Sequence, residues 1–258
     1  MTRPGAFHAA VSVFTIIPVP SIAVDRDTAR RAVLALPWVG LLLGAIAAVV
    51  AGGVRALDGG SLLASVLALT LLAAVTGAMH LDGLADTADG IGSRRPADEA
   101  LTIMKRSDIG PMGVATLVLV LLVDAAALAS PHLQGAKLLA ALACLPMVGR
   151  VPVLTSTGRS APNARPGGFG ALFSGVTSGR GWALSALGVL GVSVLAGGWA
   201  AGLRGALAFG GAPLLSWLAA WWTQRRLVRR FGGLTGDLMG ALVEVTQLVF
   251  VVVLGVVA

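Results

Sequence analysis

Long apolar stretches without charge are the feature of this sequence that most constrains its fold. A membrane-spanning helix needs about 20 predominantly apolar residues, and the stretches at 32–54 and 61–79 contain no charged residue. The sequence does not show the regular alternation of apolar and polar residues that a membrane β-barrel needs. It therefore predicts an all-α integral membrane protein, a polytopic bundle of about seven transmembrane helices, at 32–54, 61–79, 111–130, 136–156, 182–203, 205–222 and 238–258.

The composition also favours a membrane protein. Only 12% of the residues are charged, against about 25% in soluble domains, and the mean hydropathy is +0.88. The net charge of +7 would indicate a nucleic-acid partner in a soluble protein, but membrane proteins retain Lys and Arg in their cytoplasmic segments. We therefore expect a single polytopic membrane domain over residues 1–258 that contacts lipids and binds no nucleic acid. The sequence does not decide whether the chain forms homo-oligomers.

The distribution of basic residues predicts the orientation of the bundle. Of the 19 Lys and Arg residues, only Arg55, Lys137 and Arg204 lie in or beside the short connections between predicted spans. By the positive-inside rule, the side that carries the other basic residues is cytoplasmic. We expect a multi-pass protein of the cell (inner) membrane whose active site faces the cytoplasm. The cytoplasmic loops are predicted at 80–110, 157–181 and 223–237.

The apolar segment 6–24 precedes the first predicted span. Pro18 and Pro20 interrupt it, and proline in a helix interior removes a hydrogen bond and bends or breaks the helix. We interpret this segment as an interfacial or re-entrant helix, with a true membrane span as the alternative.

The clearest chemical pattern follows the second predicted span, where three aspartates occur close together. At 100° per residue, Asp82, Asp86 and Asp89 project from one narrow face of a helix. Carboxylates that close repel one another unless a hard cation lies between them, and Mg²⁺ binds through a few carboxylates while leaving positions for phosphate oxygens. The pattern therefore favours a magnesium site at Asp82, Asp86 and Asp89. The alternative is a solvated acidic helix end, which the helix dipole disfavours.

These residues belong to a pattern that resembles a known family. The chain resembles the cobalamin synthase family, the membrane-bound adenosylcobinamide-GDP ribazoletransferases, over nearly its whole length. The two most specific blocks are His80-Leu81-Asp82-Gly83-Leu84-Ala85-Asp86, followed by Asp89-Gly90, and Gly232-Gly233-Leu234-Thr235-Gly236-Asp237. The other matches are Phe14-Thr15, Pro18-Val19-Pro20, Pro37, Gly40–Gly44, Ile103-Met104-Lys105, Ser107, Ile109-Gly110, Gly113, Arg150, Gly168, Gly170, Phe173, Gly240-Ala241 and Glu244.

The resemblance implies a Mg²⁺-dependent phosphotransferase of cobalamin biosynthesis. Alpha-ribazole, or its 5′-phosphate, would attack adenosylcobinamide-GDP and release GMP. The resemblance and the side-chain chemistry together imply a catalytic set of His80, Asp82, Asp86, Asp89, Lys105, Arg150, Asp237 and Glu244. The substrate-binding set is Arg94, Ser107, Gly168, Gly170 and Thr235.

Several of these residues have alternative structural interpretations. Asp237 also fits the N-cap of the last span, and Arg150 is either a snorkelling side chain or a phosphate clamp and partner of Glu244. Glu244 lies two turns inside the membrane, where an ionisable side chain indicates a functional role. Asp124 is predicted to face away from the site and is given no catalytic role.

The sequence departs from the family pattern after Lys105. The family has Asp-Ser-Arg-Ile-Gly at this point, whereas here Arg106 and Asp108 exchange the two charges. Asp108 is also placed to cap a helix that begins at Pro111.

Two other functions remain open at the level of the sequence. Asp86, Asp89 and Arg94 match the first half of a CDP-alcohol phosphotransferase motif, so another membrane phosphotransferase is the alternative. A secondary transporter or metal channel is less favoured, because its acidic residues would line a route across the bilayer, whereas these gather at one side.

Overall fold

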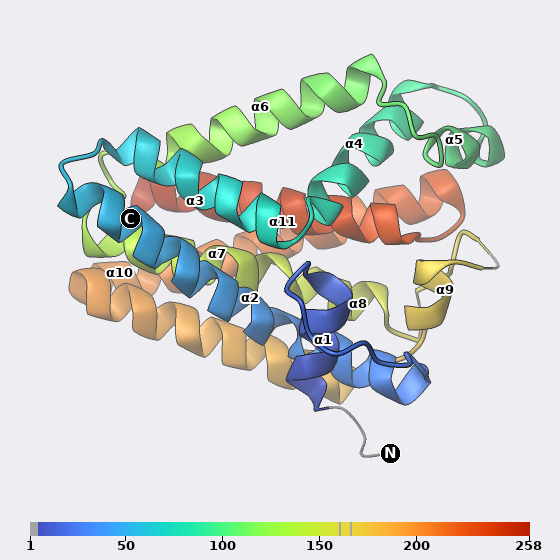
Figure 1. Cartoon of the computed structure of the whole chain (residues 1–258), viewed down its shortest axis with the longest axis horizontal. Helices are drawn as coiled ribbons and strands as arrows, with labels where there is room; N and C mark the ends of the chain where they lie inside the picture. Colours follow the sequence, from blue (N-terminus) through green and yellow to red (C-terminus); the bar gives the residue numbers. More distant parts are fainter. Residues whose placement is uncertain (1–4, 160, 166) are drawn as a thin grey trace.

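The computed structural model describes residues 5–159, 161–165 and 167–258 and shows an all-α membrane protein. Its longest helices run side by side along one axis, and the shorter helices α4, α5 and α9 lie toward one end (Figure 1). The described residues contain no β-strand, only isolated bridges. The helices are α1 (Ala6–Phe14), α2 (Arg26–Ala56), α3 (Ser61–Val75), α4 (Met79–Gly92), α5 (Ala97–Ile103), α6 (Pro111–Leu128), α7 (Ala136–Gly149), α8 (Val151–Ser156), α9 (Phe169–Phe173), α10 (Gly179–Phe231) and α11 (Gly236–Val257).

Among the described residues, five helices are long and apolar enough to cross a membrane, and the bent pair α3 and α4 makes six if it is one span. That count takes α10 as one helix of 53 residues, but its backbone is non-helical at Ala201 and Gly202. Gly202 has φ 61° and ψ −147°, a conformation open to glycine alone. Gly197 and Gly205 lie against each other across this turn. The two arms of α10 therefore run antiparallel, which matches the two spans predicted at 182–203 and 205–222.

The N-terminal segment does not cross the membrane. Helix α1 has nine residues, and at 1.5 Å per residue it is far shorter than a bilayer. Its Ala9, Ala10 and Phe14 are buried against the bundle, and the chain after it is extended. The alternative of a true span at 6–24 is therefore wrong.

The second predicted span ends in a sharp bend. Gly77 and Ala78 both have positive φ, 60° and 55°, and α4 leaves α3 at 90°. Two consecutive residues in the left-handed region end α3, because their carbonyl groups no longer point along the helix to accept its hydrogen bonds. The bend carries the aspartate block away from the axis of α3.

Close packing of glycines holds the centre of the bundle together. A Cβ atom at Gly40 of α2 would lie 2.5 Å from the carbonyl oxygen of Pro146 in α7. Small residues let membrane helices approach this closely, which strengthens van der Waals contact where lipid offers no hydrophobic driving force.

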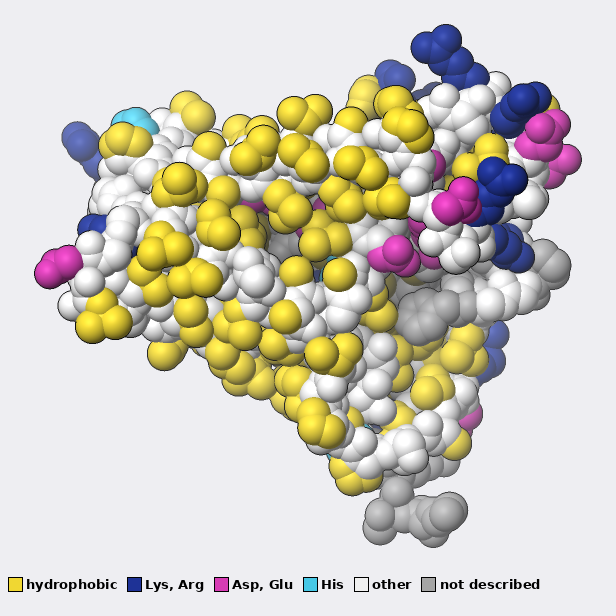
Figure 2. Space-filling view, turned by 45° about the horizontal axis from the view of Figure 1, so that its top comes forward, with side chains coloured by type: hydrophobic (Ala, Val, Ile, Leu, Met, Phe, Trp, Pro, Cys, Tyr) yellow, Lys and Arg dark blue, Asp and Glu magenta, His cyan; other side chains and the backbone are white. Residues whose placement is uncertain are grey.

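Charged side chains gather at one end of the molecule. Figure 2 shows Lys, Arg, Asp and Glu concentrated at the end that holds α4 and α5, beside a broad band of apolar side chains over the spans. This arrangement agrees with the charge asymmetry of the sequence, and it places the aspartates at the more highly charged end.

Candidate active site

The three predicted aspartates lie along α4, past the bend that ends α3. Asp82 is exposed, while Asp86 and Asp89 are half-buried. Burial first, and then the carboxylates of Asp82, Asp237 and Asp89, raise the pKa of Asp86 to about 7, with Arg165 opposing them. A carboxyl group surrounded by carboxylates is a place where a cation is stabilised.

Two glycines bring Asp237 to this cluster. A Cβ atom at Gly83 of α4 would lie 2.5 Å from the carbonyl oxygen of Asp237, and one at Gly240 of α11 would lie 3.3 Å from the Cα of His80. Larger residues would force the two helices apart at this crossing. The two most specific sequence blocks thus meet where Gly83 of the first block and Gly240, three residues after the second block, let α4 and α11 cross closely.

The block at 232–237 forms the entry to α11. Gly232 ends α10 with φ 76°, and the backbone N–H of Leu238 donates to Thr235 Oγ1 at 3.3 Å. Thr235 is therefore the N-cap, so the interpretation of Asp237 as the cap is wrong. Asp237 lies in the first turn, where the helix dipole favours a negative charge.

Arg165, which the sequence analysis missed, reaches the same place. Its Nη1 lies 3.3 Å from Asp237 Oδ2, and its Nη2 donates to the Leu101 carbonyl oxygen at 2.6 Å. Backbone hydrogen bonds between residues 162–164 and the 232–237 block hold Arg165 in this position. The Leu234 N–H donates to the Pro162 carbonyl oxygen, and the Ala164 N–H donates to the Leu234 carbonyl oxygen. This pairing joins segments about 70 residues apart (162 to 234), and no local sequence pattern marks it.

Asp89 caps a distant helix. Its two carboxylate oxygens accept from the N–H groups of Gly110 and Gly113, at 2.7 and 2.8 Å. The start of α6 is thus capped by Asp89, and the prediction that Asp108 caps it is wrong. The Asp89 carboxylate accepts hydrogen bonds from amides that have no partner within α6, at the positive end of the helix dipole. This contact stabilises both the charged carboxylate and the start of α6.

The aspartates offer the oxygen donors that Mg²⁺ prefers. Asp82, Asp86 and Asp237 share one region. Asp89 already accepts hydrogen bonds from two backbone amides, so only its remaining lone pairs are free for a metal. Within the described residues, no three His, Cys, Asp or Glu side chains stand close enough to form a ready-made metal site. The chemistry of these aspartates matches Mg²⁺, which one or two carboxylates and phosphate oxygens commonly hold, but their spacing among the described residues does not form a complete site.

Three cavities surround the aspartates. The cationic cavity, of about 400 Å³, is lined by Lys105, Asn163, Arg165, Gly167, Gly168, Gly170, Thr235, Gly236 and Asp237. The mixed-charge cavity, of about 240 Å³, is lined by Asp86, Asp89, Gly92, Ser93, Ile103, Arg106, Asp108, Gly110, Pro111 and Met112. The apolar cavity, of about 190 Å³, is lined by Phe14, Val33, Leu36, Met79, His80, Asp82, Val153, Thr157, Phe173, Gly236, Asp237, Met239 and Gly240.

These cavities collect most of the predicted substrate-binding residues. Gly168, Gly170 and Thr235 line the cationic cavity together with Lys105. Arg94 and Ser107 are exposed and line none of the three cavities, although their neighbours Ser93, Arg106 and Asp108 line the mixed-charge cavity.

The exchanged charges share one cavity. Arg106 and Asp108 both line the mixed-charge cavity beside Asp86 and Asp89. The exchange therefore leaves one positive and one negative side chain at the same cavity.

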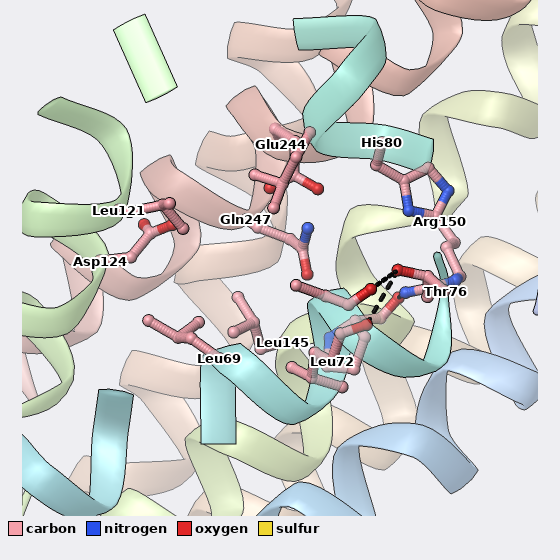
Figure 3. A pocket seen from close by; sticks show the side chains of 13 residues that line it. Leu69, Leu72, Thr76, His80, Leu121, Asp124, Leu145, Arg150, Glu244 and Gln247 are labelled. Atoms are coloured by element: carbon pink, nitrogen blue, oxygen red, sulfur yellow. Dashed lines mark hydrogen bonds between the residues drawn. The ribbon is translucent and has the colours of Figure 1, made fainter. Parts of the chain in front are cut away.

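A fourth, buried polar cavity lies deeper in the bundle. Figure 3 shows Asp124 of α6, Glu244 and Gln247 of α11, Arg150 and His80 pointing into it from surrounding helices. All five side chains are buried, with 8% or less of each residue exposed. The prediction that Asp124 faces away is wrong, because packing turns that side of α6 toward α11.

Arg150 is held in this buried cavity rather than at the aspartates. Its Nη1 donates to the Pro146 carbonyl oxygen at 2.8 Å, while its Nε and Asp124 Oδ1 lack hydrogen-bond partners among the described residues. Arg150 and Glu244 face the same space, as predicted. This burial excludes snorkelling, and Arg150 lines none of the three cavities beside the aspartates. His80 alone lines both this cavity and the apolar cavity.

Comparison with known proteins decides the family. Residues 6–255 match the family model of cobalamin-5-phosphate synthase. The chain belongs to the cobalamin-5-phosphate synthase family. Among its relatives, the adenosylcobinamide-GDP ribazoletransferase of Pseudomonas aeruginosa is 40% identical over 252 residues, 95% of each chain. The proteins of that name from Frankia casuarinae and Desulforamulus reducens are 37% and 38% identical, over 93% and 97% of this chain and 90% and 96% of theirs. No solved structure matches the chain.

Membership of the cobalamin-5-phosphate synthase family confirms the resemblance drawn from the two sequence blocks. The comparisons give no support to the CDP-alcohol phosphotransferase alternative. In this member of the family, the blocks lie on α4 and at the start of α11, which cross beside the cavities just described.

Proposed function

We propose that this protein transfers the adenosylcobinamide-phosphate moiety of adenosylcobinamide-GDP to alpha-ribazole, or to its 5′-phosphate. A ribose hydroxyl oxygen forms a bond to the cobinamide-side phosphorus, the bond from that phosphorus to GMP breaks, and the hydroxyl proton leaves. The products are GMP and adenosylcobalamin or its 5′-phosphate. The names of the relatives state this class of donor and acceptor.

The observation that carries the proposal is the junction of cationic and acidic groups at Asp237. This residue lines both the cationic and the apolar cavity and stands next to Arg165. Phosphoryl transfer depends on positioning and on neutralising charge more than on covalent catalysis. A pyrophosphate in the cationic cavity would meet Lys105 and Arg165, with its reacting phosphorus toward the aspartates.

We propose Mg²⁺ as the cofactor, held by Asp82, Asp86 and Asp89, with Asp237 beside them. Bound Mg²⁺ would neutralise charge on the pyrophosphate and on the departing GMP. Asp89 would contribute only the carboxylate lone pairs that are not used by its hydrogen bonds from the N–H groups of Gly110 and Gly113.

The acceptor of the ribose proton belongs to the border of the apolar cavity. Asp82 and Asp237 line it, and a carboxylate is able to take a proton from a hydroxyl within hydrogen-bond reach. His80 lines it as well, but burial, and then the charge of Arg150, lower its pKa to about 3, so it is a weak base. Arg150 and Glu244 lie one cavity deeper, so we assign them the positioning of His80 and α11 rather than contact with substrate.

We also propose that the site faces the cytoplasm of a cell whose inner membrane holds the protein. The excess of basic residues lies at the end with α4 and α5, and such residues stay on the cytoplasmic side. A cysteine introduced in loop 157–181 should resist labelling from outside intact cells.

Incubation of the purified protein with adenosylcobinamide-GDP, alpha-ribazole and Mg²⁺ tests the proposal. We expect equal amounts of GMP and a cobamide, loss of both products with EDTA, and recovery when Mg²⁺ is restored. Omitting alpha-ribazole should abolish GMP release, which separates transfer from hydrolysis. GMP release that needs no acceptor, or transfer to a lipid alcohol instead, would contradict the proposal.

A further inference from the structure

The apolar cavity differs from the other cavities beside the aspartates in its chemistry. Besides α4, which contributes Met79, His80 and Asp82, five helices form its apolar walls, through side chains such as Phe14 of α1, Leu36 of α2, Val153 of α8, Phe173 of α9 and Met239 of α11. These five residues are all buried. A preformed, mostly apolar cavity with a few polar groups at its border is the usual form of a site for a small organic ligand.

Its size limits what can enter. Its volume of about 190 Å³ is the smallest of the three cavities beside the aspartates, and it is on the scale of one bicyclic aromatic ring system. A corrin macrocycle with its amide side chains is several times larger. The apolar cavity therefore suits a base rather than the cobinamide.

Its lining selects among the three bases in the reaction. Guanine and the adenine of the adenosyl group carry donors and acceptors around their edges, and burying these without partners is costly. A dimethylbenzimidazole, the base of ribazole, has only its ring nitrogens as polar atoms, and one of them bonds to ribose. Phe14 and Phe173, whose ring centroids lie 5.7 Å apart and tilted by 52°, offer an aromatic wall for such a ring.

The charged groups at the border of the apolar cavity fit a base that lies inside it. Asp237 borders both the apolar and the cationic cavity, and Asp82 borders the apolar cavity. A base in the apolar cavity would leave its ribose at these carboxylates, opposite a pyrophosphate near Lys105 and Arg165. The attacking hydroxyl and the phosphorus would then meet at the junction.

From this geometry, we infer that the apolar cavity between α1, α2, α8, α9 and α11 binds the benzimidazole base of the acceptor nucleoside and sets which bases are accepted. The inference rests on the proposed function for its choice of ligand. It assigns acceptor specificity to α1 and α9, which carry none of the aspartates.

Two substitutions of opposite size test the inference. Val153→Phe should fill the cavity and raise the KM for alpha-ribazole by about tenfold or more, the scale on which pocket shape discriminates. The KM for adenosylcobinamide-GDP should change less than about twofold. The matched control is Val49→Phe, at an α2 residue that is 74% exposed, and it should change neither KM.

Phe14→Ala should enlarge the cavity, so that ribosides with one more fused ring gain rate relative to alpha-ribazole. Phe7→Ala, on the same helix at a residue 44% exposed, is its control. Phe14→Ala also keeps the inference testable if Val153→Phe does not fold.

Binding of alpha-ribazole alone, followed by its fluorescence, separates this inference from the proposed function. Wild-type protein should bind it without donor, and Val153→Phe should bind it about tenfold more weakly. An unchanged affinity in a folded Val153→Phe protein would overturn the inference while leaving turnover intact. A KM rise confined to adenosylcobinamide-GDP would overturn it as well. Binding without any turnover would overturn the proposed function alone.

Discussion

Two groups of ionisable side chains in this protein differ in their exposure and in the signs of their charges. On α4 and α11, Asp82, Asp86 and Asp237 lie at an open, charged end and repel one another. In the buried polar cavity, Arg150 is enclosed with Glu244 and Asp124 and is 2% exposed. Like charges at an exposed site repel one another and are stabilised when a cation or a charged ligand binds between them. Opposite charges buried among helices are stabilised by their attraction for one another. The first arrangement suits chemistry, and the second suits the positioning of helices.

The largest effect that separates the two regions should come from Asp86→Asn. Removing a carboxylate from the cluster should lower turnover by at least about a hundredfold, the scale of losing one key electrostatic contact. The apparent midpoint of thermal unfolding should stay the same or rise, because repulsion with Asp82 and Asp237 decreases. GMP release and thermal unfolding of the same preparation measure both. Full turnover in this variant would remove Asp86 from the site.

Arg150→Met should reverse that pattern. It leaves two buried acids without their cation, and removing one partner of a buried charge pair costs about 3–5 kcal/mol. We expect a clear fall in the unfolding midpoint, larger than for Asp86→Asn. Glu244→Gln, which removes a charge but keeps the shape, should cost less. An unchanged midpoint in Arg150→Met would show that the buried charges do not support the bundle.

Asp89 belongs to the open region but acts there partly as a helix cap. Asp89→Ala should lower the stability by about 1–2 kcal/mol through loss of the cap on α6, in addition to its effect on rate. Asp108→Ala is the matched control and should leave stability unchanged, since Asp108 does not cap that helix. Equal loss in both variants, measured by thermal unfolding, would contradict the assignment of the cap.

The smallest effect should come from restoring the family order of charges. In the double variant Arg106→Asp with Asp108→Arg, both charges remain at the mixed-charge cavity, where exposed pairs contribute only about 0–1 kcal/mol. Turnover should change less than about threefold. Each single substitution changes the net charge of the cavity and should have a larger effect on the KM for adenosylcobinamide-GDP. A double variant as impaired as the singles would show that position matters more than net charge.

The sequence reveals what depends on local patterns. Hydropathy predicted the spans, including both arms of α10, and helical spacing placed Asp82, Asp86 and Asp89 on one face. It did not reveal Arg165, because the position of that side chain depends on pairing between 162–164 and Leu234. Nor did it give the orientation of Asp124, since the rotation of α6 is set by packing against α11 and not by hydropathy.

The assignment of caps failed for a related reason. Asp108 and Asp237 both precede or begin a helix, which is the position that predicts an N-cap. The caps are instead the carboxylate of Asp89, from another helix, and the hydroxyl of Thr235. Several oxygens compete for the same amides, and tertiary contacts decide which of them is used.

Titration with Mn²⁺ in place of Mg²⁺, followed by electron paramagnetic resonance, most directly tests the claim that the open aspartates hold the reactive centre. With adenosylcobinamide-GDP present, wild-type protein should bind the ion, Asp86→Asn should bind it at least about tenfold more weakly, and Glu244→Gln should bind it as wild type does. Wild-type affinity in Asp86→Asn, or weakened binding in Glu244→Gln alone, would contradict the division between the two regions.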